Sequence, residues 1–399
     1  MKKYIILTSA IRNAGGAQQY AANKLSYMES HGWEPFVFFY YDGEIKINYL
    51  KKFAGYFIPE LGNSVNSISN SVISRVLTKI AQFVKNDNDE IVVESDGLHL
   101  SFWGEIIAKS ISAKHVMFPL EEVFWKISKR EAAFFDFKIK RDEIMTGSQK
   151  RLKQVFQRYY QPEYSNHIHG VTAYCSNVVD YTPTEIPSEL LTDDSVKILS
   201  IGRLKKPYII PMLQDIKGFA INHPMKKISL IMIGGDNDPS IEQNIKTIFI
   251  DVKNVTLFML GYVFPIPYDW IKISDVCIAS SNSVLVSANE GIPTIVIDGH
   301  DLKAIGVYGF TTTNKVFRSE EPIISVSTLL DEILVEGKYP KTLKDNSQND
   351  EFDKYFQPHL DFLQKTTQGL AYYDVNIIYP WYDCIKGWAK RIVREFIRK

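Results

Sequence analysis

The sequence predicts an α/β protein with two domains, each built on a mostly parallel β-sheet. Short β-rich runs alternate with helical stretches along the chain, which is typical of parallel strands joined by crossover helices. The 399 residues, 45% of them apolar, exceed what one typical hydrophobic core holds. A polar, proline-containing run at residues 181–194 separates the two halves and has the composition of a linker.

Composition narrows the classes of function. The 46 Lys and Arg balance the 46 Asp and Glu, so no overall field attracts nucleic acid. The cysteines have no metal-ligand or paired spacing, which fits a reducing cytoplasm. We also expect no metal and no cofactor. The apolar run near the start is too short for a signal peptide, and no run approaches the roughly eighteen apolar residues that span a bilayer.

The first domain is expected to start with a strand at residues 4–8, a glycine pair and a helix at residues 18–30. Gly15 and Gly16 permit close approach of the backbone, so this loop can place N–H groups against a phosphate. The loop matches neither the dinucleotide fingerprint nor the P-loop, so a tight strand-to-helix turn is an equal alternative.

Further strands are expected at residues 34–41, 91–93, 115–118 and 171–175, with a helix at residues 102–112. The carboxyl ends of parallel strands meet at one edge of a sheet, where open α/β proteins bind ligands. Four polar residues follow such ends: Asp96, His99, Glu121 and Glu122. A general base belongs at this edge, although each residue alone also fits a solvated loop.

The segment at residues 123–161 is basic and aromatic, with ten Lys or Arg against four Asp or Glu. Its helical pattern suits an anionic membrane surface or an anionic acceptor, and equally a solvated face whose aromatic side lies in the core. The final stretch, residues 385–399, also has an apolar helical stripe among basic residues. There we favour a helix packed back on the body over one lying on an anionic membrane.

The second domain is expected to have strands at residues 196–201, 228–233, 255–259, 275–279 and 294–297. Each ends in glycine, serine or a charged residue, so a polar ligand can approach this sheet edge closely. Arg203, Lys205 and Lys206 follow the first of these strands and suit a diphosphate. Small polar residues at positions 280–283 precede an apolar helix as an expected N-cap cluster, whose geometry also suits a phosphate.

Several motifs together resemble a known family: ILSIGRLKK, LIMIGGD, NVTLFMLGYV, SDVCIASS and NEGIPTIVID. They resemble the donor-binding half of GT-B glycosyltransferases, especially the large retaining family (group 1) that uses sugar nucleotides to build surface polysaccharides. The opening TSAIRNAGGAQQYAANKL resembles that family's first strand, glycine loop and helix. The resemblance runs through most of the chain as a succession of loose motifs.

The resemblance implies two Rossmann-like domains facing each other across a cleft. The expected boundaries are residues 1–190 for an acceptor-side domain, 195–370 for a nucleotide-sugar domain, and 371–399 for helices packing back on the first domain. The implied donor-binding residues are Gly15, Gly16, Arg203, Lys205, Lys206, Gly234, Gly235, Gly261, Tyr262, Ser281, Asn282 and Ser283. Arg203 with a neighbouring lysine is implied to contact the diphosphate, and Glu121 or Asp96 to stand near the reacting sugar as the catalytic acid or base.

One departure from the family pattern concerns its paired glutamates, which precede a Gly-x-Pro and bind the donor sugar and the ribose. Val286 stands at the second glutamate position, and the loop that holds the first is shortened. Glu290 is the nearest acid, one residue before Gly291 and on another helical face. Either residues 281–283 and backbone N–H groups bind the donor, or part of the site is lost.

We therefore expect transfer of a sugar from a nucleotide-diphosphate donor to a saccharide or lipid-linked acceptor, in cell-surface polysaccharide or glycoconjugate synthesis. We expect no nucleic-acid partner and no metal, because cationic side chains can stabilise the departing diphosphate. The expected location is the cytoplasm, with the anionic inner face of the membrane as a further partner. Two alternatives stay open: a catalytically reduced scaffold on the same fold, and a sugar-nucleotide epimerase or glycan phosphorylase.

Overall fold

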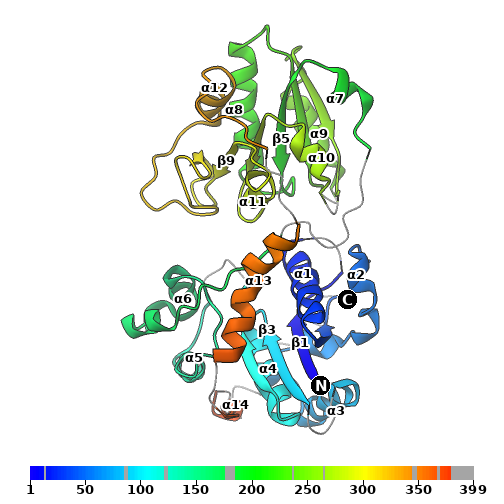
Figure 1. The fold of residues 1–399 in the computed structure, drawn as a ribbon, viewed down its shortest axis with the longest axis vertical. Coiled ribbons are helices and arrows are strands. Elements are labelled where there is room, and N and C mark those ends of the chain that lie inside the picture. The colour runs from blue at the N-terminus through cyan, green and yellow to red at the C-terminus, as the bar shows by residue number, and fades with distance from the viewer. Residues whose placement is uncertain are drawn as a thin grey trace. The chain divides into compact units, whose positions relative to one another are not determined.

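The computed structural model describes residues 1–12, 15–84, 89–120, 125–175, 185–235, 238–263, 266–343, 348–365 and 369–378. The chain forms two compact units, each with its own β-sheet (Figure 1). The first unit comprises Met1–Cys175 and Gln348–Lys399, and the second comprises Ser176–Ser347. Strands alternate with helices in both units, which confirms the predicted α/β class.

The first unit has a parallel sheet in the order β2-β1-β3-β4. Its strands are β1 (Lys2–Thr8), β2 (Trp33–Phe39), β3 (Glu90–Ser95) and β4 (Lys114–Met117). Its longer helices are α1 (Gly16–Ser30), α3 (Asn70–Val84), α4 (Leu98–Ser110), α5 (Lys129–Ile139), α6 (Gln149–Phe156) and α13 (Gln348–Lys365). The short ones are α2 (Asn48–Lys51) and α14 (Val375–Ile378), with 3-10 turns η1 (Ala54–Tyr56), η2 (Pro59–Gly62), η3 (Val65–Ser67), η4 (Gln157–Tyr159) and η5 (Pro162–His167).

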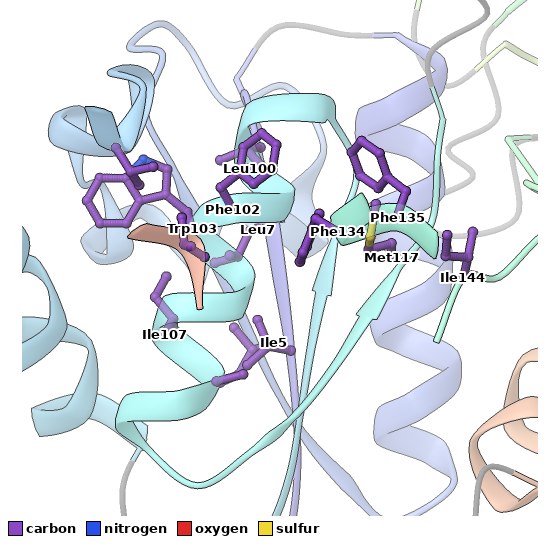
Figure 2. Packing of buried hydrophobic residues seen from close by; sticks show 14 of the residues in the cluster. Ile5, Leu7, Leu100, Phe102, Trp103, Ile107, Met117, Phe134, Phe135 and Ile144 are labelled. Carbon is purple, nitrogen blue, oxygen red and sulfur yellow. The ribbon is translucent and has the colours of Figure 1, made fainter. Parts of the chain in front are cut away.

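The core of the first unit joins the sheet to helices α4 and α5 (Figure 2). Ile5 and Leu7 of β1 lie beside α4, while Phe134 and Phe135 of α5 lie beside Met117 of β4. All five side chains are fully buried. The basic segment at residues 123–161 thus buries Trp125, Phe134, Phe135 and Phe156 in this core, as the second of the two interpretations predicts for its aromatic side.

Two expectations for the first unit differ from the structure. Residues 171–175 form no strand, because they pack against α13 instead, and Thr172 O accepts a hydrogen bond from His359 Nε2 at 3.1 Å. The expected boundary at residue 370 is too late, because α13 packs on α1 and Tyr27 OH donates to Asp353 Oδ1 at 3.1 Å. The chain thus returns to the first unit at residue 348. The predicted terminal helix at residues 385–399 lies outside the described residues.

The second unit has a sheet in the order β10-β9-β8-β5-β6-β7, with β10 antiparallel to β9 and the other pairs parallel. Its strands are β5 (Val196–Ile201), β6 (Ile228–Ile233), β7 (Val255–Met259), β8 (Val276–Ala279), β9 (Thr294–Ile297) and β10 (Ala304–Val307). Its helices are α7 (Ser188–Thr192), α8 (Ile209–Asn222), α9 (Pro239–Ile248), α10 (Tyr268–Lys272), α11 (Ser283–Ala288) and α12 (Val326–Leu334). Helices α8 and α12 pack together (Figure 1). They share one apolar cluster with the sheet, while α10 and α11 share another.

Two kinds of feature are absent from the part of the chain that the structure describes. None of its helices is long and apolar enough to cross a membrane. No group of three or more His, Cys, Asp or Glu side chains in it is arranged to hold a metal ion.

Candidate functional site

The donor-binding residues predicted in the second unit lie at the carboxyl edge of its sheet. Five parallel strands, β5 to β9, end at this edge. The residues just beyond them include Gly202 and Arg203 after β5, Gly234 and Gly235 after β6, Gly261 and Tyr262 after β7, and Ser280, Ser281, Asn282 and Ser283 after β8. Because β8, β5, β6 and β7 are successive neighbours, these four groups lie side by side along the edge.

Glycines let the ends of β5, β6 and β7 approach each other closely. Gly234 has a φ of +141°, and a Cβ at this residue would lie 1.9 Å from Gly202 O. Its N–H donates to Gly261 O at 2.8 Å. A Cβ on Gly235 would lie 2.7 Å from the Tyr262 ring, so this ring covers the glycine. The close contact between the ends of β5 and β6 therefore requires glycine at position 234, which keeps the edge low there.

The loop after β5 brings three cations to the same edge. Arg203 and Lys205 are exposed, whereas Lys206 is half-buried with its Nζ 5.6 Å from the centroid of the Tyr208 ring. Hydrogen bonds at the start of α9 hold the pKa of Asp238 below its usual value, and the nearby charge of Lys205 lowers it further. Arg203 pairs with no carboxylate among the described residues. Its guanidinium group is therefore available to a bound anion.

Tyr208 belongs to this edge and was not predicted from the sequence. Its side chain is 3% exposed, and its hydroxyl would lie 2.7 Å from a Cβ on Gly202. The hydroxyl makes no hydrogen bond to any residue that the structure describes. Burial raises the pKa of this phenol, so it stays neutral. No local pattern in the sequence signals such a hydroxyl, because its burial depends on how α8 packs beneath the β5 loop.

The turn between β8 and α11 differs from the capping cluster that the sequence predicts. Helix α11 is six residues long, and Asn282 stands at its N-cap without a side-chain capping bond. Ser281 has a φ of +64°, and its N–H donates to Lys315 O at 2.7 Å. Asn282 Oδ1 accepts from Lys315 Nζ at 3.3 Å. The polar residues of this turn thus bind a distant loop, and Lys315 joins the edge as a cation that the sequence did not reveal.

Neither Val286 nor Glu290 lies where it could replace the paired glutamates of the family pattern. Val286 is 8% exposed and packs in the apolar cluster with Trp270 and Ile292. Glu290 lies 3.9 Å from Lys272 and just before β9 begins, at the amino edge of the sheet. Neither residue can serve a ligand at the carboxyl edge.

Asp96 lies at the carboxyl end of β3, as predicted. It is 8% exposed and accepts a hydrogen bond at 2.5 Å from the hydroxyl of Thr8, the last residue of β1. His99 is two residues into α4, where burial lowers its pKa and its Nε2 has no hydrogen-bond partner among the described residues. Glu121 and Glu122 lie outside the described residues.

The glycine loop of the first unit is less constrained than that of the second. Helix α1 begins at Gly16, and Gly15 at its N-cap has an extended φ of 176°. A Cβ on Gly16 would lie 3.7 Å from Cys175 Sγ, which is ordinary contact. A Cβ on Gly15 would lie 2.9 Å from the flexible side chain of Gln18. The described backbone therefore does not require glycine at either position.

Comparison with known proteins supports the fold. No family model matches the sequence, and no curated protein matches it. Solved structures do match: a glycosyltransferase from Rickettsia africae is 14% identical, with 91% of this chain and 99% of that one covered and a TM-score of 0.62. HepE from Anabaena, solved with UDP and glucose, is 14% identical over the same shares of the two chains, with a TM-score of 0.59. A putative UDP-N-acetylglucosamine 2-epimerase from Listeria monocytogenes is 12% identical, covering 94% and 99%, with a TM-score of 0.51.

The chain has a GT-B-like fold. At these identities the similarity establishes the fold and leaves the reaction to the residues of the site.

The first unit of this GT-B-like chain contains a buried charge cluster that the sequence did not predict. Glu94, which is fully buried, accepts a hydrogen bond from Tyr20 OH at 2.8 Å and another from Tyr4 OH. Lys24 Nζ lies 3.6 Å from Glu94 and 2.5 Å from His359 Nδ1 on α13. Burial lowers the pKa of Lys24 to about 8, against the opposing pull of Glu94. The cluster ties α1, β3 and α13 together.

A second buried cluster lies between the same sheet and α4. Ser95 Oγ lies 3.0 Å from His115 Nε2, and Glu105 Oε2 lies 2.7 Å from His115 Nδ1 and 3.0 Å from Lys138 Nζ. Gly104 leaves room for this imidazole, because a Cβ there would lie 2.3 Å from it. A hydroxyl, imidazole and carboxylate in series can support nucleophilic catalysis. Here each of the three residues is at most 2% exposed and out of reach of a substrate, so we assign these residues a structural role.

Proposed function

We propose that the chain transfers a sugar from a nucleoside-diphosphate donor to a saccharide or lipid-linked acceptor, in the synthesis of a surface polysaccharide or glycoconjugate. One observation carries this proposal: Arg203 is exposed at the carboxyl edge of the second sheet, beside strand ends that glycines bring close together. A low, cationic edge suits a flat base and a diphosphate. The same fold in HepE, which was solved with UDP and glucose, supports the choice of ligand class.

The chemistry we propose for Arg203 is stabilisation of the leaving group. When the bond between sugar and diphosphate breaks, negative charge grows on the departing diphosphate oxygens. A guanidinium group can bind two of these oxygens at once. Its interaction with them becomes stronger as their negative charge increases. Lys205 supplies further positive charge from the same loop. This step requires no metal ion.

We propose Asp96, or Glu121, as the acid or base on the sugar side. Asp96 is the described candidate, and its carboxylate is already oriented by the Thr8 hydroxyl. A carboxylate held in this way can accept a hydrogen bond from a sugar hydroxyl or a proton from an acceptor.

The test is binding of UDP, GDP and dTDP, measured by isothermal titration calorimetry and by thermal unfolding. A ligand present at a hundred times its dissociation constant should stabilise the protein by about 2.7 kcal/mol. Arg203→Ala should lower the affinity for the most tightly bound of the three nucleotides by about 10-fold to 100-fold, since hydrogen bonds to a charged group contribute about 1.5–3 kcal/mol. Lys253→Ala, an exposed cation before β7 at the opposite edge of the sheet, is the matched control and should bind normally. Equal binding by the Arg203 variant would overturn the proposal.

A second candidate is a sugar-nucleotide epimerase, which the similarity to the Listeria protein favours. An epimerase would convert a sugar nucleotide without any acceptor, whereas a transferase would release free nucleoside diphosphate as the sugar reaches the acceptor. Incubation with UDP sugars and detection of either product separates the two. Failure to bind any of the three nucleoside diphosphates would instead favour a scaffold that has lost donor binding.

A further inference from the structure

Lys315 reaches the candidate site from a loop far along the chain. Its carbonyl oxygen accepts a hydrogen bond from Ser281 N–H at 2.7 Å, and its Nζ donates to Asn282 Oδ1 at 3.3 Å. Both partners belong to the turn at the carboxyl end of β8. Backbone and side chain of Lys315 are therefore each attached to the same turn, which places the ammonium group at this edge of the sheet.

Two carboxylates fix the loop on either side of Lys315. Asp298, which is 1% exposed, accepts hydrogen bonds from the backbone N–H groups of His300, Asp301 and Arg318 at 2.6–2.7 Å. Burial alone would raise its pKa, but these N–H groups lower it. Gly299 N–H also donates to Val316 O at 2.7 Å, which holds the residue next to Lys315.

Glu321 holds the other side of the loop. It accepts from Thr312 Oγ1 at 2.7 Å, from Asn314 Nδ2 at 2.6 Å and from Ser319 N–H at 2.7 Å. Despite a contribution from burial in the opposite direction, these donors lower its pKa to about 2. A loop with this many internal bonds presents Lys315 at little entropic cost when a ligand binds.

Lys315 and Arg203 flank one pair of neighbouring strands. Strand β8 lies next to β5, with Ala279 opposite Ile201 at their carboxyl ends. Arg203 follows β5 two residues beyond this pair, and Lys315 contacts the turn that follows β8. Cations at two neighbouring strand ends can each bind one of two linked phosphates.

We propose that Lys315 is a phosphate ligand of the nucleoside-diphosphate donor and forms a two-cation site with Arg203. The inference rests on the proposed function and names a residue and a chemical group within that same site. Asn282 positions the ammonium group through its Oδ1 at 3.3 Å, and a charged phosphate oxygen is a stronger acceptor for this group than a neutral amide oxygen.

The experiment compares Lys315→Gln and Lys315→Arg with wild type, by calorimetric titration of UDP and of uridine. Lys315→Gln should bind UDP about 10-fold to 100-fold more weakly, and uridine, which has no phosphate, unchanged. Lys315→Arg should retain most of the affinity for UDP. The matched control is Lys253→Gln, which removes the same charge from the opposite edge of the sheet. A further expected result is a smaller dependence of UDP affinity on salt in Lys315→Gln, since one phosphate contact is lost.

The outcomes separate this inference from the proposed function. If wild type binds UDP and Lys315→Gln binds it within twofold of wild type, the role of Lys315 is overturned and the proposed function stands. If Lys315→Gln weakens UDP and uridine equally, the role is also overturned, because the residue then supports the base or the fold. If wild type binds none of UDP, GDP and dTDP, the proposed function fails and this inference fails with it.

Discussion

The carboxyl edges of the two sheets differ in what they do with charge. In the first unit the acids are buried and already bonded, with Asp96 held by Thr8 and Glu94 held by two tyrosines and Lys24. In the second unit the cations at the edge are exposed or half-buried, and glycines bring the strand ends together beneath them. Removing one member of a buried ion pair leaves an uncompensated charge, whereas exposed cations at a sheet edge attract anionic ligands. The same alternation of strands and helices thus buries bonded charges in one unit and presents cations at the strand ends in the other.

The largest expected effect comes from breaking the buried cluster of the first unit. Glu94→Ala should lower the free energy of unfolding by about 3–5 kcal/mol, because it leaves the charge of Lys24 and two tyrosine hydroxyls without their carboxylate. Glu90→Ala, at an exposed position on the same strand, should change it by less than about 0.5 kcal/mol. Urea denaturation measures both. Similar losses in the two variants would show that the buried cluster does not hold the unit together.

The next effect concerns the glycine contact of the second unit. Gly234→Ala should destabilise the protein by about 3 kcal/mol, because the new methyl group would meet Gly202 O and the backbone has a φ of +141°. Gly218→Ala, inside helix α8 with open space around it, should instead stabilise by about 0.5–1 kcal/mol. Thermal unfolding of the pair checks the opposite signs, and a neutral Gly234→Ala would contradict the close approach of the strand ends.

A third prediction uses the buried imidazole of the first unit. Burial lowers the pKa of His115 to about 4 from an ordinary 6.5, so the unfolded chain binds a proton between these values that the folded chain does not. Stability should therefore fall as the pH is lowered from 6.5 towards 4, by about 2–3 kcal/mol. His115→Asn should flatten the curve in this window. An unchanged slope in urea titrations of this variant would assign the acid sensitivity elsewhere.

Glu105 should extend the loss of stability to lower pH. Burial raises its pKa, but the hydrogen bond from His115 and the charge of Lys138 lower it to about 2. Its contribution is present above its unfolded pKa and is lost as the pH falls through about 2. The unfolding curve of the wild type should therefore keep falling below pH 4.

The smallest effect is expected at the glycine loop of the first unit. Gly16→Ala should change stability by less than about 1 kcal/mol, because the added methyl group only touches Cys175 Sγ. The affinity of the Gly16→Ala variant for UDP then tests the phosphate contact that the family resemblance implies, without interference from a loss of stability. A large loss of stability would show that this loop is as constrained as Gly234, and the contrast between the two glycine loops would be wrong.

Local patterns in the sequence predicted much of the fold and one side of the site. Strand ends and the glycines and cations that follow them are contiguous in the chain, so the sequence alone is enough to place Arg203 and Gly234 on one edge. The run at residues 171–175 has the composition of a strand, but its place against α13 depends on a helix far along the chain. Boundaries fixed by tertiary packing, such as the return at residue 348, were therefore missed.

The rest of the site depends on contacts between distant segments. Lys315 is joined by a hydrogen bond to Asn282, which lies 33 residues earlier in the chain. Lys24 has the sequence context of a solvated helix residue, and only the packing of α13 buries it. Residues 280–283 were predicted to form an N-cap cluster for the following helix, but Asn282 makes no side-chain capping bond. Instead, Ser281 N–H and Asn282 Oδ1 form hydrogen bonds with Lys315. Local sequence patterns do not predict contacts between residues this far apart in the chain.

The most direct test of the difference between the edges is hydrogen–deuterium exchange with and without UDP. We expect protection in peptides covering residues 202–206, 234–235 and 280–283, and in the loop at residues 312–318, all at the carboxyl edge of the second sheet. Peptides at its opposite edge, around residues 193–197, should not change. Protection confined to other segments, with the carboxyl edge exchanging as freely as before, would contradict the assignment of this edge as the nucleotide site.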